Sequence, residues 1–151
     1  MGKWPFLASQ WGGAIALQMA AEQRVDACAV AAPALRLATN AEILIPLLSW
    51  ANFTLPSNLQ QNFYLPCYDF YHSKALRALW QVSRRARNSL TKISCPVFSV
   101  HSHNDTTIPP GVIDWLQRDV SSCTHQWFDA SNHVLTRDVD GDEVCRRVAE
   151  F

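Results

Sequence analysis

The chain has 151 residues, with 13 basic and 13 acidic side chains and a formal net charge of zero. Its length predicts one domain with a sizeable core, and 48% apolar against 17% charged residues excludes a disordered chain. Zero net charge gives no support for a nucleic-acid or anionic-membrane partner. No apolar run reaches the roughly 20 residues that a membrane-spanning helix needs.

The cysteines predict a reducing environment. They are odd in number, scattered, and include no C-x-x-C pair, which is typical of free thiols. The N-terminus lacks a basic segment followed by an apolar run and a cleavage site, so we expect no signal peptide and a cytoplasmic location. The five residues are Cys28, Cys67, Cys95, Cys123 and Cys145.

The first elements alternate between strand and helix. A short apolar strand is predicted from Trp4 to Ala8, and apolar residues at helical spacing follow from Gly12 to Glu22. A second buried strand is predicted from Val25 to Ala32, before Pro33. This order predicts an α/β fold with a parallel sheet.

Residues 34–90 interrupt the alternation of strands and helices. They predict a cap or lid inserted into a single domain of residues 1–151. Three prolines interrupt residues 34–71, which predicts irregular segments and short helices. From Ser73 to Leu90 we expect a helix with a basic, solvated outer face. The aromatic side chains of this segment are either core residues or the lining of an apolar ligand site: Trp50, Phe53, Phe63, Tyr64, Phe70 and Tyr71.

After residue 94 the sequence again predicts alternating strands and helices. The sequence predicts a buried strand over Cys95–His101, a helix from Pro109 to about Val120, and a short strand over His125–Asp129. An amphipathic helix is expected from Asp140 to Phe151.

The turn after the first strand predicts a strained nucleophile elbow, in which the residues two before and two after the apex must be small. With Gln10 at the apex these residues are Ala8 and Gly12, and both fit. Gly13 would then allow the helix to pack closely. The pattern therefore places an amide where a nucleophile is expected.

Ser9 is the alternative apex. It would put Leu7 and Trp11 at the crowded positions, and both side chains are too large. A displaced nucleophile at Ser9 is therefore the less favoured interpretation.

Three stretches resemble α/β-hydrolases, in particular carboxylesterases, monoacylglycerol lipases and serine aminopeptidase-like hydrolases. Residues 8–13, A-S-Q-W-G-G, resemble the family's G-H-S-W-G-G. Residues 93–109 are similar to I-x-x-P-V-L-x-x-x-G-x-x-D-x-x-V-P, with Asp105 at the triad acid and Ser102 in place of the usual glycine. Residues 130–135 resemble the S-G-H loop, with His133 at the triad base.

The resemblance implies the C-terminal part of an α/β-hydrolase fold: a parallel sheet flanked by helices, a cap insertion, and missing N-terminal strands. It implies ancestral hydrolysis of a carboxylic ester, with a small ester or lipid-like substrate and no cofactor. Position 10 would hold the nucleophile, Asp105 the acid, His133 the base, and the Trp11 N–H one half of the oxyanion hole.

Two departures from the family predict that the chain is inactive alone. Gln10 cannot form an acyl-enzyme as an activated serine does. The segment that supplies the other half of the oxyanion hole in the family has no counterpart before the elbow. The strand at Trp4–Ala8 would also keep an open edge, where a partner or a second copy is expected to associate.

Two other functions remain open. One is a non-catalytic ligand-binding or scaffold protein on the same fold. The other is a metal-dependent hydrolase, because His101, His103 and Asp105 form an H-x-H-x-D pattern directly after a strand, as in metallo-β-lactamase-like enzymes. Thr106 stands where that pattern has its last histidine.

Overall fold

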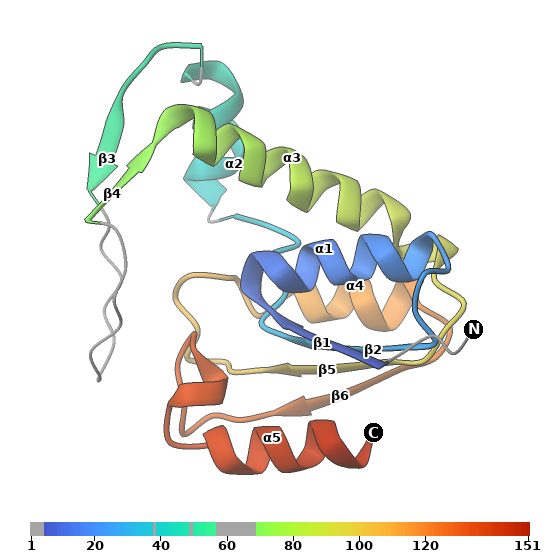
Figure 1. The fold of residues 1–151 in the computed structure, drawn as a ribbon. Helices are drawn as coiled ribbons and strands as arrows, with labels where there is room; N and C mark the ends of the chain where they lie inside the picture. Colours follow the sequence, from blue (N-terminus) through green and yellow to red (C-terminus); the bar gives the residue numbers. More distant parts are fainter. Residues whose placement is uncertain (1–4, 38, 49, 57–68) are drawn as a thin grey trace.

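The structure is a computed structural model that describes residues 5–37, 39–48, 50–56 and 69–151. A four-stranded sheet carries helices on both faces, and a smaller unit stands away from it (Figure 1). Four residues discussed above, Trp4, Phe63, Tyr64 and Cys67, lie outside the described residues.

The main sheet is parallel throughout and confirms the predicted α/β class. Its strands have the order β1-β2-β5-β6. Every residue of β5 is buried, as expected for a parallel strand covered on both faces. Strand β6 begins and ends two residues before the predicted strand. The strands are β1 (Pro5–Ser9), β2 (Ala27–Ala31), β5 (Val97–His101) and β6 (Cys123–Trp127).

Two apolar cores lie on the two faces of the sheet. Helices α1 (Gln10–Ala21) and α4 (Val112–Asp119) cover one face, with α3 (Ser73–Ser89) packed on the outer side of α1, and α5 (Gly141–Glu150) covers the other face (Figure 1). Strand alternation divides β2 between the cores, because Cys28 and Val30 enter the first while their neighbours enter the second. The predicted helices at these four places are confirmed.

The middle of the chain forms the outlying unit. Helix α2 (Thr39–Leu48) is followed by β3 (Thr54–Pro56) and β4 (Phe70–His72), which pair antiparallel. The sequence pattern did not predict this small sheet, because three-residue strands are too short to show a period of two. Short 3₁₀ turns occupy Leu90–Lys92 and Leu135–Arg137.

The outlying unit is bonded to α3 at two places. At the start of α3, the Ser73 hydroxyl donates to the Ala51 carbonyl oxygen at 2.7 Å and accepts from the Phe53 N–H at 3.3 Å. Glu42 accepts hydrogen bonds from Trp80 Nε1 at 3.2 Å and from the Leu37 N–H at 3.0 Å. The end of α3 belongs to the main core, where Ala86 and Leu90 are fully buried. A cap spanning residues 34–90 stays a prediction. Helix α2 and strands β3 and β4 stand away from the main sheet (Figure 1), whereas Ala34 and Leu35 belong to the main core.

Among the described residues, β1 pairs only with β2 and forms one edge of the main sheet. Leu7 on this strand is 44% exposed. The predicted association at this edge stays a prediction. In the described part of the chain no helix is long and apolar enough to cross a membrane.

A steric constraint at the start of α5 generates the first prediction. A Cβ atom on Gly141 would lie 2.9 Å from the carbonyl oxygen of Thr136, which is backbone and cannot move aside cheaply. We expect Gly141→Ala to lower the free energy of unfolding by about 2 kcal/mol, measured by urea denaturation. Gly111→Ala is the matched control, because its nearest atom, Asp114 Oδ2, is 3.8 Å away. Equal stability of the two variants would contradict this account of the close approach.

Candidate active site

Gln10 stands at the apex of a sharp turn between β1 and α1. Its φ is 53°, in the left-handed region that costs a residue with a Cβ atom about 1 kcal/mol. A Cβ on Gly12 would lie 3.5 Å from that of Ala8, so these two positions face each other across the turn. A Cβ on Gly13 would lie 3.2 Å from Pro33 Cα. The local geometry is that of the elbow expected with Gln10 at its apex.

The two neighbours of Gln10 are placed differently. Ser9 is the last residue of β1, with extended backbone and an exposed side chain. Trp11 lies in the first turn of α1, where N–H groups have no acceptor within the helix. Its ring is half-buried against the main core. The oxyanion role that the resemblance implies for the Trp11 N–H stays a prediction.

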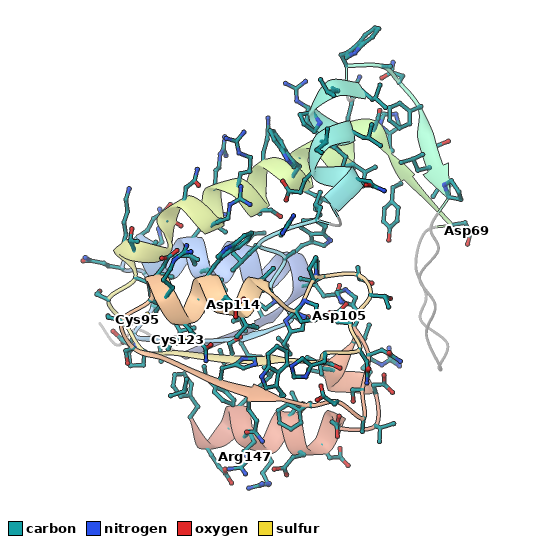
Figure 2. The ribbon with its side chains drawn as sticks, turned by 180° about the vertical axis from the view of Figure 1, so that it is seen from behind. Asp69, Cys95, Asp105, Asp114, Cys123 and Arg147 are labelled. Carbon is teal, nitrogen blue, oxygen red and sulfur yellow. The ribbon has the colours of Figure 1, made fainter. Side chains whose placement is uncertain are left out.

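Asp105 and His133 form a direct, buried hydrogen bond. His133 Nδ1 donates to Asp105 Oδ2 at 2.8 Å, and the two side chains are 6% and 1% exposed. Asp105 lies in the loop after β5, and His133 lies in the loop after β6. Figure 2 shows Asp105 at the opposite end of the sheet from Cys95 and Cys123. Because the strands are parallel, Gln10 after β1 belongs to the same end as this pair.

The Asp105 carboxylate has further partners on both oxygens. Oδ1 accepts from the N–H groups of Thr107 and Ile108 at 2.8 and 2.9 Å, and Oδ2 lies 3.3 Å from His101 Nε2. Burial acts to raise the pKa of Asp105, but the hydrogen bonds from His101 and His133 outweigh it and hold that pKa well below its usual value. The group is therefore an anion that orients His133.

His101 is the site residue whose role the sequence analysis missed. It is fully buried, and its Nε2 also lies 3.2 Å from the Ile108 carbonyl oxygen. Both neighbours of Nε2 are acceptors, so the proton of the neutral ring belongs on that atom. The sequence could have indicated this role, because a histidine at the end of a fully buried strand needs a buried hydrogen-bond partner.

A serine replaces the usual family glycine and links the two loops. The Ser102 hydroxyl donates to the Ser131 carbonyl oxygen at 2.6 Å and accepts from the Asn104 N–H at 3.0 Å. Ser131 Oγ in turn accepts from the Asp140 N–H at 2.8 Å. These contacts fix the loop that carries His133 against the loop that carries Asp105.

The metal alternative receives no support. His103 stacks on Trp127 with ring centroids 3.7 Å apart, and its Nδ1 lies 2.9 Å from Asp129 Oδ2. It therefore pairs at the surface, while His101 is buried beside Asp105. Within residues 5–37, 39–48, 50–56 and 69–151, no three histidine, cysteine or acidic residues are placed to hold a metal ion.

An apolar pocket of about 340 Å³ lies in the outlying unit. Its walls come from α2, β3, β4 and the first turns of α3, and include two of the aromatic residues singled out in the sequence, Phe53 and Tyr71. Of the other four, Trp50 and Phe70 are exposed, at 80% and 54%.

Comparisons with known proteins identify the fold. The sequence matches no protein-family model. A solved structure from a study of LipS and LipT, two metagenome-derived lipolytic enzymes, matches 97% of this chain with a TM-score of 0.89 at 20% identity. The monoacylglycerol lipase of Paleococcus ferrophilus matches 99% with a TM-score of 0.82 at 18% identity. The chain has the α/β-hydrolase fold.

A further match is the monoglyceride lipase of Saccharomyces cerevisiae, solved with a substrate analogue, with a TM-score of 0.69 at 15% identity over 95% of this chain. The chain spans 63%, 67% and 58% of the lengths of these three structures. It therefore corresponds to a part of the α/β-hydrolase fold, as the sequence predicted.

The backbone of Gln10 generates a stability prediction. Glycine adopts a positive φ without steric cost, so Gln10→Gly should raise the free energy of unfolding by up to about 1 kcal/mol. Gln23, just after α1, has a φ of 57°, and Gln23→Gly is the matched control with the same expected sign. Thermal denaturation of both variants measures the effect. A loss of stability in Gln10→Gly alone would show that the glutamine side chain stabilises the turn.

His125 on β6 generates a pH prediction. Both its ring nitrogens are shielded from solvent, and burial, aided by His101 and His103, lowers its pKa from 6.5 to about 4. As the pH drops, the His125 ring is protonated in the unfolded chain before it is protonated in the folded chain. The free energy of unfolding therefore falls as the pH drops from about 6.5 to 4. His125→Gln should remove a pH-dependent loss on the order of 1 kcal/mol, measured by denaturation across this range. Parallel pH profiles of wild type and variant would contradict the assignment.

Proposed function

We propose that this chain derives from a carboxylic ester hydrolase, keeps the acid–base pair of that reaction, and has lost the nucleophile. The observation that carries the proposal is the strained backbone of Gln10 at the elbow, on the same end of the sheet as the Asp105–His133 pair. Gln23 and Ala32 also have a positive φ, so what distinguishes Gln10 is its place at the strand-to-helix turn on the same end of the sheet as the acid–base pair. The proposed substrate class is a lipid-like ester, in keeping with the lipases that the chain resembles in fold.

We assign each residue of the candidate site a separate role in this reaction. Asp105, held as an anion, orients His133 through Nδ1 and leaves Nε2 to accept a proton. The Trp11 N–H would donate to the oxyanion of an acyl-transfer intermediate. Gln10 offers a carboxamide, which has no acidic hydroxyl for His133 to deprotonate, so no acyl-enzyme forms. The protein would therefore carry out no acyl transfer as it stands.

A second candidate is the binding of an apolar ligand without turnover. The observation that favours it is the 340 Å³ pocket, whose walls are almost entirely apolar. This function needs neither a nucleophile nor an oxyanion hole. It differs from the first in where the ligand binds, because substitutions in the pocket, and not at position 10, would weaken the binding of a long-chain ligand.

Covalent labelling tests the proposal. Wild-type protein should not react with a serine-directed fluorophosphonate, while Gln10→Ser should be labelled, because the proposal puts the new hydroxyl within reach of the base His133. The matched controls are Gln10→Ala and the double variant Gln10→Ser/His133→Ala, and neither should be labelled. Intact-protein mass spectrometry measures the adduct.

Labelling of the wild-type protein that disappears in Ser9→Ala would overturn the proposal, because Ser9 would then be the nucleophile. No labelling of a folded Gln10→Ser variant would show that position 10 is not an acylation site. A cytoplasmic location stays a prediction and is not needed for either outcome.

A further inference from the structure

The ring of His133 is held at one nitrogen and open at the other. Nδ1 donates to the Asp105 carboxylate at 2.8 Å, so the lone pair of the neutral ring is on Nε2. Among the described residues nothing bonds to Nε2, and this atom is not one of the polar atoms that are closed off from solvent. His133 therefore presents an oriented base that a small molecule can reach.

The other four histidines of the chain do not combine these two properties. Nδ1 of His101 and both ring nitrogens of His125 are shielded from solvent. His72 uses its ring to cap the start of α3. His103 pairs with Asp129 at the surface, where the two side chains are 56% and 51% exposed. Only the remaining histidine joins a buried carboxylate at one nitrogen to a second nitrogen that is open to solvent.

The carboxamide of Gln10 is unpaired at the same end of the sheet. The backbone carbonyl oxygen of this half-buried residue accepts from the Ala34 N–H, but its side chain makes no hydrogen bond with the described residues. A carboxamide has two N–H donors and no acidic hydroxyl. It can donate to a carbonyl oxygen on which negative charge develops. This end of the sheet therefore offers a base and a donor.

The charges around the base favour an uncharged substrate. Asp105 is held as an anion by its hydrogen bonds, and Asp138 accepts from the Asn132 N–H at 2.9 Å, one residue before His133. Two carboxylates beside the base repel an anionic substrate. A neutral carbonyl compound avoids this repulsion and supplies an oxygen to which a carboxamide can donate.

We propose that the chain removes a proton from the carbon beside a carbonyl group, with His133 as the base and the Gln10 carboxamide as the donor to the enolate oxygen. The α C–H bond breaks and its proton goes to Nε2. The electron pair of that bond forms the carbon–carbon double bond, while the π electrons of the carbonyl group move to the oxygen. The imidazolium then returns a proton to the carbon, so the reaction needs no oxidant, nucleophile or leaving group.

The inference rests on the acid–base pair of the proposed function but requires no acyl-enzyme. Deprotonation of a carbon acid needs one molecule to be positioned at the base, whereas hydrolysis of an ester by water needs two. Each positioned molecule costs translational and rotational entropy. A site that has a base and a donor but no nucleophile therefore favours the one-molecule reaction.

Exchange of the α-protons of phenylacetone in deuterium oxide tests the proposal. With the full chain these protons should exchange at least roughly 100-fold faster than with an equal concentration of N-acetylhistidine. His133→Gln should lose this acceleration, because glutamine can still donate to Asp105 but is not a base. Gln10→Ala should lower the rate roughly ten-fold or more. Proton NMR measures the exchange, and circular dichroism checks that the variants are folded.

His103→Ala is the matched control, because it removes an exposed imidazole from the surface. Its rate should stay within about two-fold of wild type. A wild-type rate no higher than that of N-acetylhistidine would overturn the proposal, whether or not the variants fold. So would a rate unchanged in His133→Gln or in Gln10→Ala, or an equal loss in His103→Ala.

Hydrolysis of phenyl acetate separates the proposal from its nearest alternative. Hydrolysis that depends on His133 without α-proton exchange would overturn the proposal, because the base would then act on water. Fluorophosphonate labelling reports on the nucleophile and α-proton exchange reports on the base. The proposed function and this inference can therefore fail separately.

Discussion

The Asp105 carboxylate is the interaction on which the candidate site depends. It accepts hydrogen bonds from two backbone N–H groups of its own loop and from His101 and His133. A buried anion without these donors would be costly, and with them it fixes both the loop after β5 and the position of His133. The Ser102 hydroxyl adds a second link between the same two loops. The acid–base pair is therefore built into the packing of the sheet end and persists whether or not the chain performs catalysis.

The positive φ of Gln10 is held by backbone packing around the turn. Gly13 lies against Pro33, and the Gln10 carbonyl oxygen accepts a hydrogen bond from the Ala34 N–H at 3.0 Å. None of these contacts involves the side chain of residue 10. The shape of the turn is therefore compatible with side chains of different chemistry at its apex.

Apolar side chains are buried around the main sheet but exposed on the outlying unit. The two cores on the sheet bury their apolar side chains, whereas α2 presents its own at the surface beside the cations of α3. The candidate site at the end of the sheet and the apolar pocket of the outlying unit therefore lie in different parts of the chain.

The sequence by itself determined the order of the main elements, the parallel sheet and the register of the elbow. These follow from local rules: the period of apolar residues, the proline and glycine breaks, and the small residues needed at Ala8 and Gly12. The family resemblance further placed Asp105 and His133 in one site. Only the tertiary structure decided that His101 shares the Asp105 carboxylate, that His103 turns away to Asp129, and that α2 exposes several of its apolar side chains. Each of these depends on which side chains meet from distant parts of the chain, and the spacing of residues along one element carries no information about such contacts.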